Sequence, residues 1–264
     1  MYSIGAMPRK IPASRFQDLI DAATSVFIAQ GYRHTQMDDV AEVMGVAKGT
    51  VYLYVESKEA LFDVVLRSAD VPRPITLPPN LPVRTPASGR TLRWVKDRLA
   101  EQPASPTLRA ALRRHARAGE AGELTRILGE VYEAMARNRT GIKLVDRCAV
   151  EYPALAKIWF TQGREALFSQ LTQYLEQGIR AGVLRPVPDP VVAARLMIET
   201  LVFWAVHRHW DPSPQPVDPR VAQDTVVQML VGALSNDVAM FKIGSNHVSG
   251  SDFTDTQCHF YTVV

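Results

Sequence analysis

Hydrophobic side chains recur every three or four positions along most of the chain, which is the spacing of one face of an α-helix. From Ala13 to Gln30 the apolar residues fall at positions 16, 19, 20, 23, 26 and 27, and Gly31 is expected to end this helix. No segment shows the strict alternation of a half-buried strand. The pattern therefore predicts an all-α protein.

Three more short helices are predicted before residue 70. Thr35 is a candidate cap for the second helix, and Gly45 is placed to end it in a left-handed conformation. In the third, Val51 and Val55 are four residues apart, so both can face inward. Ser57 is a candidate cap for the fourth.

Six prolines between positions 71 and 86 predict an extended connector and a domain boundary. Beyond it, Pro and Gly punctuation predicts helices near 90–102, 106–117, 121–148, 153–181, 189–210 and 218–235. The expected organisation is a flexible arm (1–13), a small helical domain with its connecting helix (14–70), a proline-rich linker (71–89), a larger helical domain (90–235) and a disordered tail (236–264).

Short helices with a tight Gly-containing turn before the third are typical of a helix-turn-helix module, which reads DNA. Small residues at the start of that helix allow close approach, and its polar residues can reach bases or phosphates. Residues at two helix N-termini, Thr35 and Lys58, suit phosphates. A Tyr-rich amphipathic helix can also be an ordinary packed surface helix, and this pattern alone leaves both readings open.

The stretch AATSVFIAQGYRHTQMDDVAEVMGVAKGTVYLYVESKEALF carries more information than its periodicity. Residues 14–62 resemble the N-terminal DNA-binding domain of the TetR family of transcriptional regulators, with about fifteen positions in register. The resemblance implies a homodimer that binds a palindromic operator and is released by a small-molecule effector. Two departures are Val55, where the family usually has phenylalanine, and the proline-rich linker.

Carried over by motif position, the resemblance assigns seven residues to DNA binding. They are Thr35, Lys48, Gly49, Thr50, Tyr52, Tyr54 and Lys58.

The last two predicted helices, 189–210 and 218–235, are apolar over more than one face. Burial on two sides is then needed, and the dimer interface implied by the resemblance would supply it. A monomer with a thicker core is the alternative. Large apolar side chains that could enclose an effector, or belong to an ordinary core, are Trp94, Tyr132, Met135, Trp159, Phe160 and Phe168.

Charge is unevenly distributed in this 264-residue chain of net charge +3: counted in blocks, residues 1–70 carry −2, residues 71–139 +7 and residues 140–264 −2. Any DNA-binding face in the first block must therefore be a local patch. Four arginines between 109 and 117 form a basic surface, which fits a solvated face, an extended DNA footprint or attraction for an acidic effector.

Other functional classes find little support in the sequence. Two cysteines and the lack of a signal peptide or membrane span favour a cytoplasmic protein. The sequence contains no catalytic motif or cofactor loop. His207 and His209 would point in different directions on a helix, so they do not form a metal-ligand pair. Cys148 fits packing better than redox sensing. The expected function is a ligand-responsive regulator, most simply a repressor. The alternatives are an activator, or a ligand- or partner-binding protein whose helix-turn-helix does not read DNA.

Overall fold

The computed structural model describes residues 13–101, 104–114, 122–214 and 216–235. Within these ranges the regular structure is helical, and its only β-type pairings are two isolated bridges, which confirms the all-α prediction. None of the helices described is long and apolar enough to cross a membrane. The predicted tail, and the arm up to residue 12, lie outside the described residues.

The N-terminal domain consists of α1 (Ala13–Gln30), α2 (Met37–Val43), α3 (Lys48–Val51) and α4 (Lys58–Ser68). Gly31 and Gly45 follow α1 and α2 with φ of +83° and +65°, the left-handed conformation that ends a helix at little cost for glycine. Ser57 caps α4 as predicted, since its Oγ accepts the N–H of Ala60 at 3.1 Å.

The predicted cap of α2 is wrong by one residue. Gln36 is the N-cap, and its backbone N–H donates to Oδ2 of Asp39 at 2.8 Å. Thr35 is fully buried, and its hydroxyl donates to the carbonyl of Gly31 at 2.7 Å. Its side chain therefore holds the turn between α1 and α2 together and does not face outward.

The larger domain begins with α5 (Arg90–Glu101), α6 (Pro106–Arg113), α7 (Glu123–Arg137) and α8 (Arg139–Ala149). A continuous rod follows, made of α9 (Pro153–Ala156), the π-helical η1 (Lys157–Arg164) and α10 (Glu165–Arg180). The last elements are α11 (Pro190–Ala205), the short 3-10 helix η2 (His207–Trp210) and α12 (Pro219–Leu234).

Two of the predicted helices are broken in the structure. Asn138 leaves helical geometry at φ −110° and ψ 25°, so the predicted helix 121–148 is two helices, α7 and α8. Val206 departs in the same way at φ −121° and ψ −69°, so the predicted helix 189–210 ends at Ala205. In the predicted helix 153–181 the rod continues, but η1 has the wider π turn.

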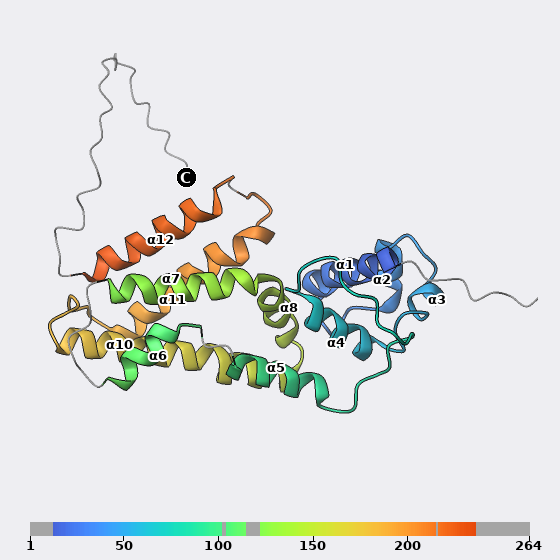
Figure 1. Ribbon diagram of the computed structural model, residues 1–264, viewed down its shortest axis with the longest axis horizontal. Helices are drawn as coiled ribbons and strands as arrows, with labels where there is room; N and C mark the ends of the chain where they lie inside the picture. Colours follow the sequence, from blue (N-terminus) through green and yellow to red (C-terminus); the bar gives the residue numbers. More distant parts are fainter. Residues whose placement is uncertain (1–12, 102–103, 115–121, 215, 236–264) are drawn as a thin grey trace, which may run out of the picture.

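The buried residues form two clusters, and α8 stands between them. The first cluster joins α1 to α4 with the inner face of α8, including Leu144, Val145 and Cys148. The second is built from α6, α7, α10, α11 and α12. Figure 1 shows α8 standing between the four N-terminal helices and the rest of the larger domain.

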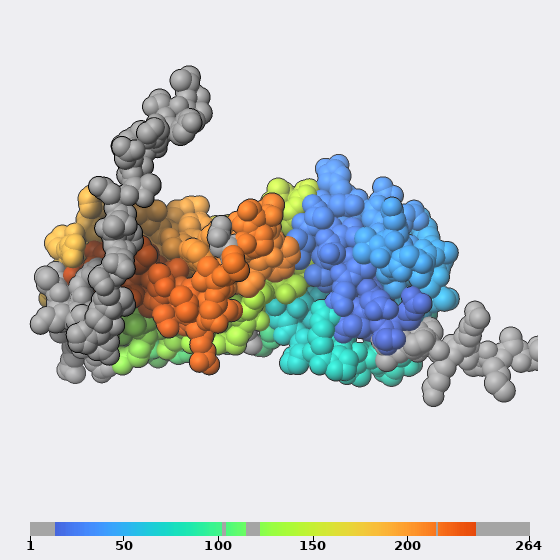
Figure 2. Space-filling view, turned by 90° about the horizontal axis from the view of Figure 1, so that it is seen from above, coloured from blue at the N-terminus to red at the C-terminus, as the bar shows by residue number. Residues whose placement is uncertain are grey.

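The space-filling view shows the same division from above. In Figure 2 the N-terminal helices form one lobe, and the yellow-green surface where α8 lies marks the join to the other lobe. The four N-terminal helices are therefore attached through packed side chains and not only through the covalent linker.

The proline-rich linker, residues 71–89, contains no helix, and it is packed against the N-terminal domain. The backbone N–H of Ile75 donates to Oε1 of Gln17 at 3.0 Å. Further along, Val83 forms a parallel bridge with Val55, the position where the TetR-like pattern expects phenylalanine. Val83 is half-buried against the first cluster, so the linker supplies apolar contact beside the smaller side chain.

Candidate DNA-binding surface and effector cavity

The outer face of α3 carries several of the predicted DNA-binding residues. Val51 is fully buried and anchors the helix, while Lys48 and Gly49 are exposed and Tyr52 is 40% exposed. An added Cβ at Gly49 would meet nothing within 4 Å, so the protein itself leaves this backbone open. A partner outside the chain can therefore reach Lys48, Gly49, Tyr52 and the partly exposed Thr50.

Tyr54 does not belong to that outer face, which corrects the sequence prediction. Its side chain is 4% exposed, and its ring centroid lies 6.3 Å from that of Phe16 on α1. Burial raises the pKa of its hydroxyl above the usual value. The reason is geometric: Tyr54 follows Val51 by three residues, so both lie on the face that packs inward.

Lys58 is also engaged within the protein. Its ammonium group donates to the carbonyls of Tyr32, Arg33 and Thr35 at 3.0, 3.2 and 3.1 Å, and it lies 5.0 Å from the centroid of the Tyr32 ring. The predicted phosphate-binding role of this side chain is therefore not what the structure displays. Lys58 instead closes the turn between α1 and α2.

Lys48 makes an ion pair that the sequence did not suggest. Its Nζ lies 2.7 Å from Oδ2 of Asp38 in the first turn of α2, and both side chains are about half exposed. The hydrogen bond to Asp38 raises the pKa of Lys48 above its usual value. Because the pair is exposed, DNA phosphates can compete for this lysine at small cost.

Leu53 is a surface residue that the sequence analysis did not assign. It is 57% exposed and follows Gly49 by four residues, so it lies one turn further along the same side of the recognition segment. The four-residue spacing from Gly49 could have predicted this position from the sequence. If this surface enters the major groove, the Leu53 side chain can contact a thymine methyl group, which is the apolar feature of that groove.

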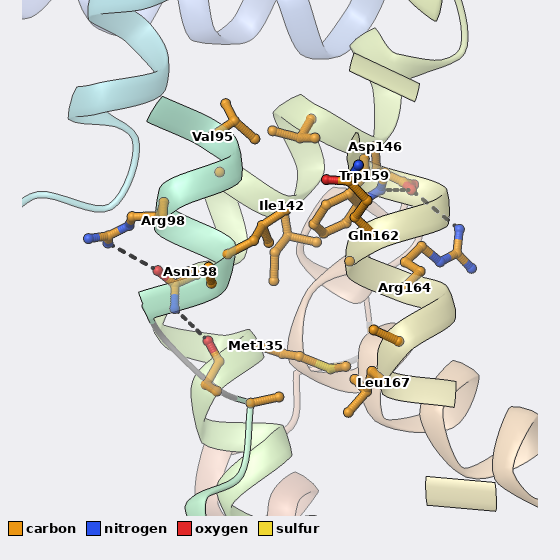
Figure 3. A pocket seen from close by; sticks show the side chains of 18 of the residues that line it. Val95, Arg98, Met135, Asn138, Ile142, Asp146, Trp159, Gln162, Arg164 and Leu167 are labelled. Carbon is orange, nitrogen blue, oxygen red and sulfur yellow. Dashed lines mark hydrogen bonds and ion pairs between the residues drawn. The ribbon is translucent and has the colours of Figure 1, made fainter. Parts of the chain in front are cut away.

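A cavity of about 450 Å³ lies among the helices of the larger domain and is bordered by the end of α4 and the residues that follow it. It is lined by residues of α4, α5, α6, α7, α8, η1, α10, α11 and η2, and most of the lining is apolar. Figure 3 shows Met135, Ile142, Trp159 and Leu167 around the space, with polar side chains at its edges. A volume of this size suits a small-molecule ligand.

The predicted effector-binding residues divide into two groups. Trp94, Met135 and Trp159 line the cavity. Tyr132, Phe160 and Phe168 lie outside its lining: Tyr132 is 3% exposed, with its hydroxyl donating to the carbonyl of Trp204 at 3.3 Å, and the other two rings are half-buried against the two clusters. Aromatic residues with the same helical spacing thus serve both the core and the cavity.

Polar groups at the cavity wall are joined in a network (Figure 3). Oδ1 of Asp146 accepts the indole N–H of Trp159 at 3.0 Å and pairs with Arg164 at 3.5 Å. Arg164 also reaches Glu199 on α11 at 2.8 Å. His207, close to these charges, has a lowered pKa, chiefly because it is partly buried. The wall is therefore held in place by contacts between α8, η1 and α11.

Three of the four arginines of the predicted basic surface, Arg109, Arg113 and Arg114, are exposed on or directly after α6. Arg109 lines the cavity, whereas Arg114 pairs with the buried carboxylate of Glu123. Arg117 lies outside the described residues.

Asp70, just after α4, lies both at the end of the N-terminal domain and at the wall of the cavity. Its carboxylate accepts the backbone N–H groups of Thr140 and Gly141 at 3.0 and 2.9 Å, so it caps the first turn of α8. Burial raises the pKa of Asp70, against the opposing effect of these hydrogen bonds. Asp70 and Gly141 both line the cavity, so this contact lies where a ligand would bind.

The other end of α8 holds α1. Arg147 donates to the carbonyl of Gln30 at 2.7 Å and pairs with Glu151 at 3.1 Å. Glu151 accepts the backbone N–H of Arg33 at 3.2 Å. An added Cβ at Gly31 would lie 2.7 Å from an atom at the end of each of these side chains, so both would have to shift to admit it.

Cys148, for which the sequence favours packing over redox sensing, is completely buried on α8. Burial raises the pKa of its thiol to about 12, so the reactive thiolate is suppressed. The packing interpretation is favoured. Within the described part of the chain, no three His, Cys, Asp or Glu side chains are grouped so that they could hold a metal ion.

Comparison with known proteins agrees with this two-part architecture. Residues 19–65 match the family model described as bacterial regulatory proteins, tetR family, and residues 123–234 match that of the AefR-like transcriptional repressor, C-terminal domain. The chain belongs to the TetR family. It is thus a DNA-binding transcriptional regulator with a ligand-responsive C-terminal domain.

Individual relatives of this TetR-family protein are distant. The Bacillus subtilis helix-turn-helix regulator YhgD is 25% identical over 218 residues, which is 82% of this chain and 95% of that protein. The fatty acid metabolism regulator of the same organism is 42% identical over 53 residues, 20% of this chain and 26% of that protein. The structure of the ketosteroid regulator KstR2 of Mycobacterium tuberculosis has a TM-score of 0.50 at 17% identity, covering 86% of this chain and 98% of that one.

The different positions of the two tyrosines give a direct test. Tyr54→Ala is expected to lower the free energy of unfolding by about 3 kcal/mol, because it empties a buried site. Tyr52→Ala is the matched control, with an expected change below about 0.5 kcal/mol, because its ring is on the surface. Urea denaturation measures both, and equal losses would contradict the assignment.

Proposed function

We propose that this TetR-family protein is a repressor that binds a palindromic operator as a homodimer and releases it when a small, largely apolar effector enters the cavity. The observation that carries the proposal is the position of that cavity. Its lining includes Asp70, in the segment that leaves the DNA-binding domain, and Gly141, in α8. A ligand there can favour one arrangement of the two domains over another.

The surface formed by Lys48, Gly49, Thr50, Tyr52 and Leu53 is proposed to enter the major groove. Val51 and Val55 hold this segment to the first cluster, so its outer residues are presented from a rigid base. Repression is favoured over activation because the C-terminal family model is that of a transcriptional repressor.

The effector is proposed to be mainly apolar because of the cavity lining. Side chains such as Val95, Met135 and Ile142 offer dispersion contacts but no hydrogen bonds, so an uncharged body fits them best. Arg98 at the edge donates to Asn138 Oδ1 over a long 3.4 Å, which leaves it able to bind a polar group at one end of the ligand.

Operator binding is the first experiment. Footprinting of DNA beside the protein's own gene is expected to show a palindromic protected site, with affinity that falls steeply as salt rises. Thr50→Ala and Tyr52→Ala should each weaken operator binding by about 1–3 kcal/mol if they make good contacts. Failure of the unaltered protein to bind any genomic fragment better than random DNA would refute the proposal.

The proposed dimer interface is the outer surface of α11 and α12. Its exposed apolar side chains are Val191, Val192, Leu196, Phe203, Val221 and Met229, and Leu196 is 62% exposed. A second copy of the same surface would remove them from water.

Leu196→Glu should convert the dimer into monomers in sedimentation experiments, because it places a charge within an apolar interface. Val150→Glu is the control, since Val150 is 71% exposed at the end of α8 and does not belong to α11 or α12. A dimer that survives Leu196→Glu would count against this interface, as would a monomeric unaltered protein.

A further inference from the structure

The segment between α4 and α5 takes a longer route than a simple connection requires. It leaves α4 beside α8, where Asp70 contacts Thr140 and Gly141. It then passes along the N-terminal domain to the end of α3 before it turns back to α5, as Figure 1 shows. The linker therefore visits the end of the domain that carries the candidate DNA-binding surface.

Two backbone hydrogen bonds fix the linker at that end. The N–H of Val83 donates to the carbonyl of Tyr54 at 2.7 Å, and the N–H of Glu56 donates to the carbonyl of Val83 at 3.0 Å. Thr85 adds two contacts: its N–H donates to Oε2 of Glu56 at 2.9 Å, and its hydroxyl donates to Oγ of Ser57 at 2.8 Å. The linker is thus held against the residues that directly follow α3.

Arg84 lies between these two anchored residues. In extended chain, neighbouring side chains point to opposite sides, so with Val83 half-buried the side chain of Arg84 is directed outward. Arg84 is exposed and has no ion-pair partner in the described part of the chain. Residues 71–89 contain two arginines and no acidic residue.

The DNA-binding domain itself has few cations to spare. Residues 1–70 carry a net charge of −2, and binding to DNA depends strongly on cations that replace the phosphate counterions. Lys58 is held by three carbonyls and Arg67 is paired with Asp63, whereas the pair of Lys48 with Asp38 is exposed and leaves that lysine available. Arg15 and Arg33 are the other arginines of the described domain, and both are exposed.

We propose that Arg84 binds a phosphate of the operator backbone beside the bases that α3 reads. The linker would then enlarge the DNA-binding surface with a cation that the TetR-type helices do not supply. This inference rests on the proposed function, because it assumes that α3 enters the major groove. It gives the linker a second role in addition to packing Val83 beside Val55.

The test compares Arg84→Gln with Arg84→Lys, which keeps the charge, and with Arg180→Gln, which removes an exposed charge at the end of α10. Affinity is measured over a salt series on the footprinted operator and on random DNA. Arg84→Gln is expected to reduce the slope of log affinity against log salt by about 0.9 per protomer and to weaken binding to both DNAs by a similar factor. Arg84→Lys should retain most of the slope, and Arg180→Gln all of it.

Several results would overturn the assignment while leaving operator binding by the unaltered protein intact. One is an Arg84→Gln variant with the original affinity and salt slope. Another is a loss confined to the operator, which would indicate base reading instead of a phosphate contact. A fall in melting temperature that matches the loss of affinity would assign Arg84 to folding. Failure of the unaltered protein to bind the operator would instead refute the proposed function.

Discussion

The arrangement of the two domains depends on how the ends of α8 are bound. The first turn of a helix has N–H groups without partners in the helix, and here the Asp70 carboxylate accepts two of them from outside. At the other end, Arg147 binds the last carbonyl of α1. One helix therefore holds the N-terminal domain at two points while its side, including Ile142 and Asp146, lines the cavity.

This geometry explains how occupancy of the cavity could reach the DNA. A ligand that moves α8 by a small distance must break or shift the contacts of Asp70, and the N-terminal domain would follow because Leu144 and Cys148 are packed in its core. The Asp146–Arg164–Glu199 network gives η1 and α11 a share in the same wall. The linker is fixed to the DNA-binding helices through the pairing of Val83 with Val55.

The sequence predicted features that depend on local spacing. The buried face of α1, the inward positions of Val51 and Val55, and the caps at Ser57 and Gly31 all follow from helical periodicity and local backbone preference. The sequence assigns Tyr54 to DNA binding, although its spacing of three residues from Val51 indicates the inward face. The break at Asn138 was missed because apolar residues continue at helical spacing on both sides of it.

Other features depend on residues that are distant in the chain. Lys58 binds carbonyls more than twenty residues away, and Val83 of the linker pairs with Val55. Asp70 reaches α8 over seventy residues. Half of the predicted effector residues line the cavity and half do not, because periodicity shows that a side chain is buried but not whether its neighbours leave space.

Hydrogen exchange of Asp70→Asn tests the central role of α8 most directly. An amide can accept through only one oxygen, so exchange is expected to accelerate at Thr140 and Gly141 and also across α1 and α4, because their attachment to α8 is weakened. Asp18→Asn, at an exposed carboxylate on α1, is the control and should leave α8 unchanged. Unaltered exchange in α8, or faster exchange there with no change in α1 and α4, would contradict the account.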